Sequence, residues 1–161
     1  MLWSAIYGLL ALAAVLLARR SPLAGLAYAL MSVWLVTFAE VHLLAVPLPV
    51  RALVYTWLMV GVTLAAAWSL VRYPAASSVI MTLSMIAGMM TFAYTRVGTD
   101  HSEVREIWSI GTNVMFGLSC LAIIITRIAD VVDRGSGELD RCADDGRLAH
   151  GHPGSWLASE E

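Results

Sequence analysis

Apolar residues fall into five long runs along this chain, and short polar turns separate them. The runs are Leu2–Ala18, Leu23–Val46, Ala52–Val71, Ala75–Thr95 and Ile107–Thr126. Most are close to the ~20 residues that span the ~30 Å hydrocarbon core of a bilayer. None alternates polar and apolar residues as a barrel strand does, and a helix satisfies its backbone hydrogen bonds inside lipid. The pattern therefore predicts an all-α, polytopic integral membrane protein with five transmembrane helices.

The turns between the runs predict two helical hairpins followed by a fifth helix. Arg20-Ser21-Pro22 closes the first hairpin, and Arg72-Tyr73-Pro74 closes the second. In each turn the proline suits the first turn of the next helix, because its φ is already helical and its missing N–H is not needed there. Between the hairpins, Pro47–Arg51 is expected to form a tight, stiff turn.

The fifth helix is expected to begin before its apolar run and to end after it. Asp100 and Glu103 resemble a capping pair, which places the start near His101. The helix should continue to Arg134 and break at Gly135-Ser136-Gly137. Residues 1–134 would then form the transmembrane bundle, and residues 135–161 a polar, acidic and disordered cytoplasmic tail.

Composition agrees with a bilayer environment. The 161 residues are 59% hydrophobic and 14% charged, with a mean hydropathy of +0.75. A soluble domain of this length could not bury so much apolar surface. All the basic residues are arginine, which indicates a GC-rich coding sequence and hence a bacterium or a phage of one.

The distribution of arginine predicts that the N-terminus lies outside and the C-terminus inside. With this orientation the outer side receives Arg51, Arg96 and Arg105. The inner side receives Arg19, Arg20, Arg72, Arg127, Arg134, Arg141 and Arg147. The first run lacks the preceding positive charge of a signal peptide, so we expect a retained helix. The predicted location is the bacterial cytoplasmic (inner) membrane, or the host inner membrane if a phage encodes the protein.

Glu40 and His42, near the outer end of the second helix, are the first candidate site. A carboxylate inside a membrane is costly and marks a functional candidate, and an imidazole beside it can exchange protons. The alternative is an interfacial position, where water or Arg51 satisfies Glu40. Residues two apart lie about 200° apart on a helix, so the two side chains form one bidentate site only if the helix unwinds.

A second polar group is predicted on the same outer side. This outer-side polar cluster contains Asp100, His101, Glu103 and Glu106, together with Arg105. Carboxylates and imidazoles suit a divalent cation, but no metal-binding spacing is present. A solvated helix start with mixed charges is therefore preferred, and no metal is predicted.

The fifth helix carries a heptad-spaced line along one face. It consists of Glu103, Glu106, Ile110, Asn113, Gly117, Cys120 and Ile124. Asn113 needs a hydrogen-bond partner in an apolar setting. The face could pack inside the monomer, pair with another subunit or line a wet pore, and packing is preferred. The stripe Met81, Met85 and Met89 could offer soft Cu(I) ligands, but packing is preferred there too.

Enzyme motifs and cofactor motifs are absent from the sequence. It contains no Gly-rich phosphate loop and no HExxH, GxSxG or CxxC pattern, and one intramembrane histidine cannot supply two axial haem ligands. We therefore predict no enzyme and no cofactor. The acidic tail argues against nucleic acid as a partner.

Two hypotheses about function follow from this pattern. The first is a small membrane protein that acts by self-association, as a pore or lesion former or as a scaffold, with membrane lipid and its own copies or another membrane protein as partners. Phage holins share this general character, but they have no diagnostic motif and no family is assigned. The alternative is an ion- or small-solute-translocating subunit or transporter accessory protein that uses Glu40 with His42 or Asn113.

Overall fold

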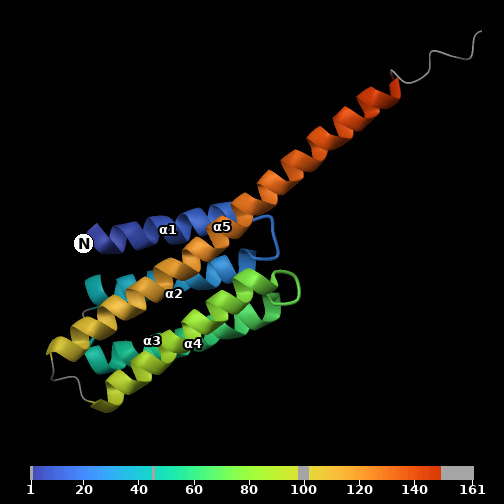
Figure 1. Cartoon of the computed structure of the whole chain (residues 1–161). Coiled ribbons are helices and arrows are strands. Elements are labelled where there is room, and N and C mark those ends of the chain that lie inside the picture. Colours follow the sequence, from blue (N-terminus) through green and yellow to red (C-terminus); the bar gives the residue numbers. More distant parts are fainter. Residues whose placement is uncertain (1, 45, 98–101, 150–161) are drawn as a thin grey trace, which may run out of the picture. The chain divides into compact units, whose positions relative to one another are not determined.

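The computed structural model describes residues 2–44, 46–97 and 102–149, and its side chains are described within residues 4–44, 46–96 and 103–134. Every regular element among these residues is an α-helix, as the apolar runs predict (Figure 1). The helices are α1 (Leu2–Ala18), α2 (Ala24–His42), α3 (Leu48–Ser69), α4 (Pro74–Val97) and α5 (Ser102–Ala149).

Proline decides where α2 ends and α3 begins. The helix α2 is continuous through Glu40 and ends at His42, earlier than the end of its apolar run at Val46. Pro47 has no N–H and disfavours helical φ/ψ in the residue before it. The predicted turn Pro47–Arg51 is instead largely helical, because α3 begins at Leu48 with proline in its first turn, where an N–H is dispensable.

The prediction that the fifth helix breaks at Gly135-Ser136-Gly137 was wrong. The helix α5 begins at Ser102, close to the expected start, and runs through these residues to Ala149. A helical glycine costs about 1 kcal/mol relative to alanine but does not forbid the helix. The following segment, residues 138–149, contains seven good helix formers (one Glu and two each of Leu, Arg and Ala) beside three Asp and Gly146. The disorder predicted for residues 150–161 lies outside the described residues.

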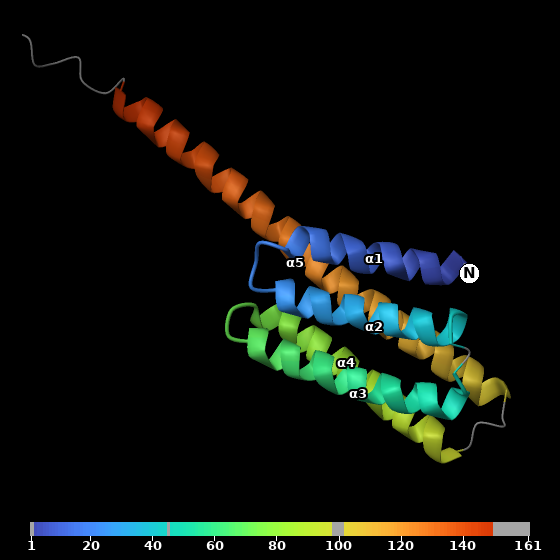
Figure 2. The same ribbon diagram turned by 180° about the vertical axis from the view of Figure 1, so that it is seen from behind.

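The chain divides into two compact units, residues 1–127 and residues 128–161. In the first unit α1 packs against α2, α2 against α3, and α3 against α4, so that consecutive helices are neighbours (Figures 1 and 2). Side chains from the first part of α5 complete the core of this unit. Phe116, Cys120 and Ile123 are all buried there.

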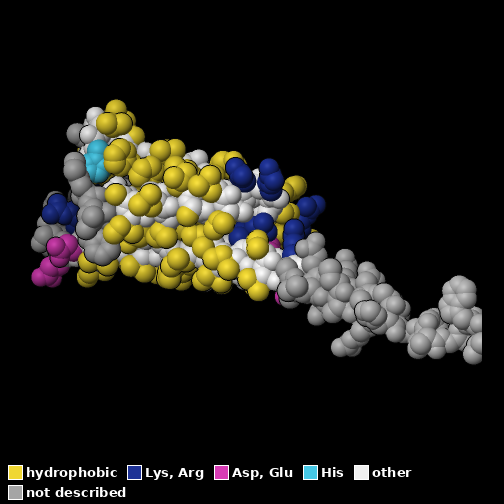
Figure 3. Space-filling model, turned by 90° about the horizontal axis from the view of Figure 1, so that it is seen from above, with side chains coloured by type: hydrophobic (Ala, Val, Ile, Leu, Met, Phe, Trp, Pro, Cys, Tyr) yellow, Lys and Arg dark blue, Asp and Glu magenta, His cyan; other side chains and the backbone are white. Residues whose placement is uncertain are grey.

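Four of the five helices are long and apolar enough to cross a membrane: α2, α3, α4 and α5. The apolar segment Ser4–Ala18 of α1 is shorter than these four helices. Large hydrophobic side chains lie on the outside of the bundle, and Trp68 is 90% exposed. Figure 3 shows hydrophobic side chains over the middle of one face, with arginines at its ends. Such a surface is stable in lipid rather than in water, which points to a membrane protein.

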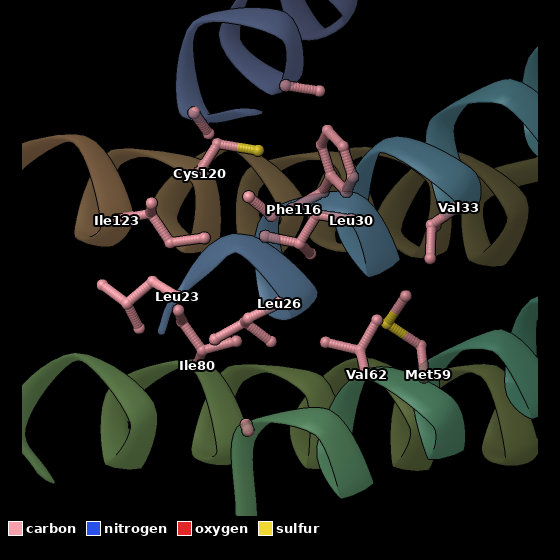
Figure 4. Close-up of a cluster of buried hydrophobic side chains, with 14 of the residues drawn as sticks. Leu23, Leu26, Leu30, Val33, Met59, Val62, Ile80, Phe116, Cys120 and Ile123 are labelled. Carbon is pink, nitrogen blue, oxygen red and sulfur yellow. The ribbon is translucent and has the colours of Figure 1, made fainter. Parts of the chain in front are cut away.

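The buried cluster is built from small residues on α1 and branched or aromatic residues on the other helices. Ala11, Ala14 and Ala18 bring α1 close to its neighbours. Figure 4 shows the residues that interlock with them: Leu23, Leu26, Leu30, Val33, Met59, Val62, Ile80, Phe116, Cys120 and Ile123. This packing holds the helices in place around the polar groups described next.

The buried serine and threonine hydroxyl groups described in this core are hydrogen-bonded. Ser69 and Ser77 bond each other at 2.9 Å, and Thr63 and Ser84 do so at 2.7 Å, so both pairs join α3 to α4. Thr91 donates to a carbonyl of its own helix at 2.8 Å. Among the described side chains, few buried polar atoms lack a hydrogen-bond partner. Those that do lie toward one end of the bundle.

Candidate functional site

A cavity of about 450 Å³ lies at the end of the bundle where α2 ends and α3 begins. We call it the end cavity. Residues of α1, α2, α3 and α5 line it. Its ionisable side chains and side-chain amide are Glu40, His42, Arg51, Tyr55, Arg105, Glu106 and Asn113. The cavity therefore brings together all three proton or ion candidates predicted from the sequence, Glu40, His42 and Asn113.

Arg51 and Tyr55 line this cavity, and each has one buried polar atom without a hydrogen-bond partner. They are four residues apart on α3, so they share one face of the helix. The Nε atom of Arg51 and the hydroxyl of Tyr55 are both buried without a hydrogen-bond partner, and Tyr55 is only 8% exposed. Leaving a buried polar group unpaired costs about 1–3 kcal/mol, so such groups are rare in folded proteins.

Glu40 faces the same cavity from α2 and is also 8% exposed. Arg51 lies near enough to act on its carboxylate electrostatically. In the described part of the chain, however, no ion pair within 4.0 Å and no side-chain hydrogen bond involves Glu40. The prediction that Arg51 could satisfy Glu40 is therefore met only at longer range.

His42 and Asn113 border the cavity from more exposed positions. The His42 ring packs on Phe38, with ring centroids 4.7 Å apart. Because α2 stays helical to its last residue, Glu40 is buried while His42 is exposed, and the two do not form one bidentate site. Both residues nevertheless line the cavity, at the C-terminal end of α2.

The outer-side polar cluster is only partly assembled. Glu106 and Arg105 line the end cavity, whereas Glu103 is exposed and is not among its lining residues. Asp100 and His101 lie outside the described residues. Within the described ranges, no three His, Cys, Asp or Glu side chains are placed to hold a metal ion.

Opposite charges balance at the end cavity. Two carboxylates, Glu40 and Glu106, face it together with two guanidinium groups, Arg51 and Arg105. At neutral pH these four groups sum to zero formal charge. The site is therefore strongly polar without attracting ions of one sign.

Aromatic residues form the other walls of the cavity. Trp34 stacks on Phe38 at 5.3 Å, and its Nε1–H donates to the carbonyl of Ser4 at 2.9 Å, which ties α2 to α1. Tyr7 and Phe116 meet edge to face at 6.2 Å. These contacts fix an apolar surface next to the charged groups.

A third aromatic group, centred on Trp108, packs against the Tyr55 ring. Trp108 of α5 lies edge-on to Tyr55 at 6.3 Å and stacks on Tyr94 at 4.9 Å. Its Nε1–H donates to the Thr91 hydroxyl at 3.0 Å. The Tyr55 ring is therefore held in place by packing, and its hydroxyl has little freedom to seek another partner.

The heptad-spaced line of α5 divides between two environments. Gly117 and Cys120 pack inside the monomer, and the Tyr7 ring lies over Gly117. Glu106 and Asn113 border the cavity, while Ile110 is 63% exposed. Packing inside the monomer, the preferred prediction, is confirmed for the second half of the line.

The methionine stripe lies at a different place. Met85 and Met89 line a largely apolar groove of about 410 Å³ between α3 and α4, and Met81 packs against the core. No histidine or cysteine lines this groove. Met85 is 52% exposed and Met89 is 70% exposed, so packing inside the monomer, the preferred prediction, holds for Met81 alone.

Tyr55 is the site residue that the sequence alone does not single out. The sequence predicts Arg51 as a possible partner of Glu40, but in a turn rather than on the helix that also carries Tyr55. The available signal was an arginine and a tyrosine four positions apart at the start of an apolar run. It became meaningful only once α3 was known to begin at Leu48.

Comparison with known proteins adds no family to this geometry. No protein-family model, no curated protein and no solved structure matches the chain.

Proposed function

We propose that this chain is a multi-pass membrane protein that binds a small solute or ion in the end cavity, as a translocating subunit or as an accessory protein of a transporter. One observation carries the proposal. The side chains of Glu40, Arg51 and Tyr55 line one cavity of about 450 Å³, and Arg51 and Tyr55 each have a buried polar atom without a hydrogen-bond partner.

Buried polar groups without partners destabilise the folded protein. Two buried donors without acceptors cost about 1–3 kcal/mol each, and a buried carboxylate without donors costs more. Such groups are typical of binding sites, where a ligand or ordered water completes the hydrogen bonds. Among the described residues, the buried serine and threonine hydroxyl groups are bonded, whereas the Tyr94 hydroxyl, which does not line the cavity, is also buried without a partner.

Orientation determines which side the cavity faces. We infer that α1 also crosses the membrane and that the N-terminus lies outside, because Arg19, Arg20 and Arg72 sit in the turns at the opposite end of the bundle. In a bacterial inner membrane the end cavity would then open outward, where it could capture a solute from the periplasmic side.

The test follows membrane potential and the entry of a DNA-binding dye during inducible expression in a bacterium. Wild type should depolarise the membrane without dye entry. Glu40→Gln should abolish the effect at equal abundance in the membrane. Glu103→Gln is the matched control, because Glu103 is an exposed carboxylate that does not line the cavity.

Two results would contradict translocation through this site. If the Glu40→Gln variant still depolarises the membrane, ion movement does not depend on the end cavity. Dye entry in both the wild type and Glu40→Gln would instead support a lesion.

Self-association remains the second candidate because two glycines lie on the surface of the bundle. Gly25 and Gly61 are exposed, and no atom lies within 4 Å of a Cβ added at either one. Small residues of this kind permit close helix packing in lipid. A pore would also need a polar surface to face its water, and the exposed large side chains of α3 and α4 are mostly apolar.

A further inference from the structure

Resting on the proposed function, we infer that the end cavity recognises a zwitterion: a molecule that carries an ammonium group and an oxyanion, either carboxylate or phosphate, beside an apolar body. Arg51 and Tyr55 would bind the oxyanion. Glu40 would bind the ammonium group. The aromatic wall around Trp34 would hold the apolar body.

The oxyanion side follows from the unpartnered atoms. Arg51 Nε–H is a donor only, and the Tyr55 hydroxyl has a proton to donate. Both atoms are buried, and they lie one helical turn apart on α3. An oxyanion offers several lone pairs and accepts from both groups at once through charge-assisted hydrogen bonds. A neutral carbonyl group would provide weaker bonds in the same place.

The ammonium side follows from Glu40. Its carboxylate is buried at the cavity and accepts no hydrogen bond from any described side chain. An ammonium group brings three donors and one positive charge. Since the Glu40 and Arg51 charges do not approach within 4.0 Å of each other, a ligand can place its own two charges between them.

The two carboxylates and two guanidinium groups at the cavity favour a ligand that carries both signs of charge. A simple anion bound at Arg51 would be repelled by Glu40 and Glu106, and a simple cation bound at Glu40 would be repelled by Arg51 and Arg105. A zwitterion satisfies both pairs. An analogue that lacks one of the two charges leaves a buried group of the site unpaired. The cost of that unpaired group is the usual way in which such a site rejects close analogues.

The apolar part of the cavity limits the size of the ligand. Trp34 and Phe38 stack on one wall, and Tyr7 and Phe116 meet on another. The volume of about 450 Å³ is within the range of small-molecule sites. The same chemistry has two sources: a free zwitterion such as an aromatic amino acid, or the ethanolamine phosphate headgroup of a lipid.

The first arm of the test measures binding of three matched soluble probes to the purified full chain in detergent. L-Phenylalanine carries both charges, N-acetyl-L-phenylalanine only the negative charge, and L-phenylalaninamide only the positive charge. Isothermal titration should show phenylalanine binding at least about tenfold more tightly than either analogue, which is the expected loss for one charge-assisted contact.

The second arm covers the lipid source. The full chain is reconstituted in vesicles of equal parts phosphatidylethanolamine and phosphatidylglycerol, and native mass spectrometry identifies the lipid that remains bound. Retention of phosphatidylethanolamine over phosphatidylglycerol supports the lipid source, and preferential binding of phenylalanine supports the free one. Absence of both preferences overturns the inference.

Variants assign each charge to its partner. Glu40→Gln should reduce the preference for phenylalanine over its N-acetyl analogue, and Tyr55→Phe should reduce the preference over the amide. In the lipid arm, each variant should reduce retention of phosphatidylethanolamine. Tyr73→Phe at the opposite end of the bundle is the control and should leave every preference unchanged. Because ratios are compared, a general loss of stability does not imitate the result.

Failure of this inference is distinguishable from failure of the proposed function. Equal binding of all three probes, weakened by Glu40→Gln but not by Tyr73→Phe, would retain a solute site at the cavity and overturn the zwitterion. Preferences that both site variants leave unchanged would overturn the cavity as the site.

Discussion

At the scale of single residues, the Tyr55 hydroxyl is a cost to the fold rather than a support. It is buried and makes no hydrogen bond, although the ring beneath it packs against Trp108. Thr63 is the contrasting case, because its hydroxyl bonds Ser84 on the neighbouring helix at 2.7 Å. Burial alone therefore does not tell whether a polar atom serves stability.

Tyr55→Phe should leave the unfolding midpoint unchanged or raise the free energy of unfolding by about 1 kcal/mol, because no bond is lost and an unpaired hydroxyl is removed. Thr63→Val should lower the free energy of unfolding by about 1 kcal/mol. Denaturant titration in detergent measures both. A loss in Tyr55→Phe equal to that in Thr63→Val would mean that the Tyr55 hydroxyl has a partner in the folded protein.

At the scale of helices, the contact between α1 and α2 depends on Gly8. A Cβ at this position would lie 2.5 Å from the Trp34 ring, closer than real contacts allow. The same indole donates to the Ser4 carbonyl. The Ser4/Gly8 pair therefore makes room for a tryptophan of α2 within the monomer, and Trp34 in turn forms a wall of the end cavity.

Gly8→Ala should displace the Trp34 ring and lower the free energy of unfolding by about 1–3 kcal/mol, which is the usual cost of overpacking. Tryptophan fluorescence and the unfolding midpoint check it. Gly61→Ala is the control, since nothing lies within 4 Å of its added Cβ. It should stabilise α3 by about 0.5–1 kcal/mol through helix propensity. Equal effects of the two substitutions would be inconsistent with the Trp34 contact.

At the scale of the whole molecule, two cysteines allow the orientation to be tested. Cys120 is fully buried in the core of the first unit, and Cys142 belongs to the second. An impermeant thiol reagent added to intact spheroplasts should not label the protein if the C-terminus lies inside. Labelling should appear after permeabilisation and be lost in Cys142→Ser, while Cys120→Ser retains it. Labelling of Cys142 in intact spheroplasts would reverse the proposed orientation.

The apolar runs were enough to predict the helices, because lipid requires each spanning segment to satisfy its own backbone hydrogen bonds. The start of α5 at Ser102 is close to the position that the spacing of Asp100 and Glu103 predicts. The errors arose where local signals compete. Proline at Pro47 ended α2 early and opened α3, and two glycines did not outweigh the helix formers after them.

The candidate site divides in the same way. The sequence by itself determined that Glu40, His42 and Asn113 were polar residues in apolar helices, since hydrophobic patterning is local information. Only the tertiary structure decided that Glu40 shares a cavity with Arg51 and Tyr55, and that none of these groups satisfies another by a short contact. Such distances depend on how helices far apart in the sequence pack, and that is set by side chains such as Trp34 over Gly8.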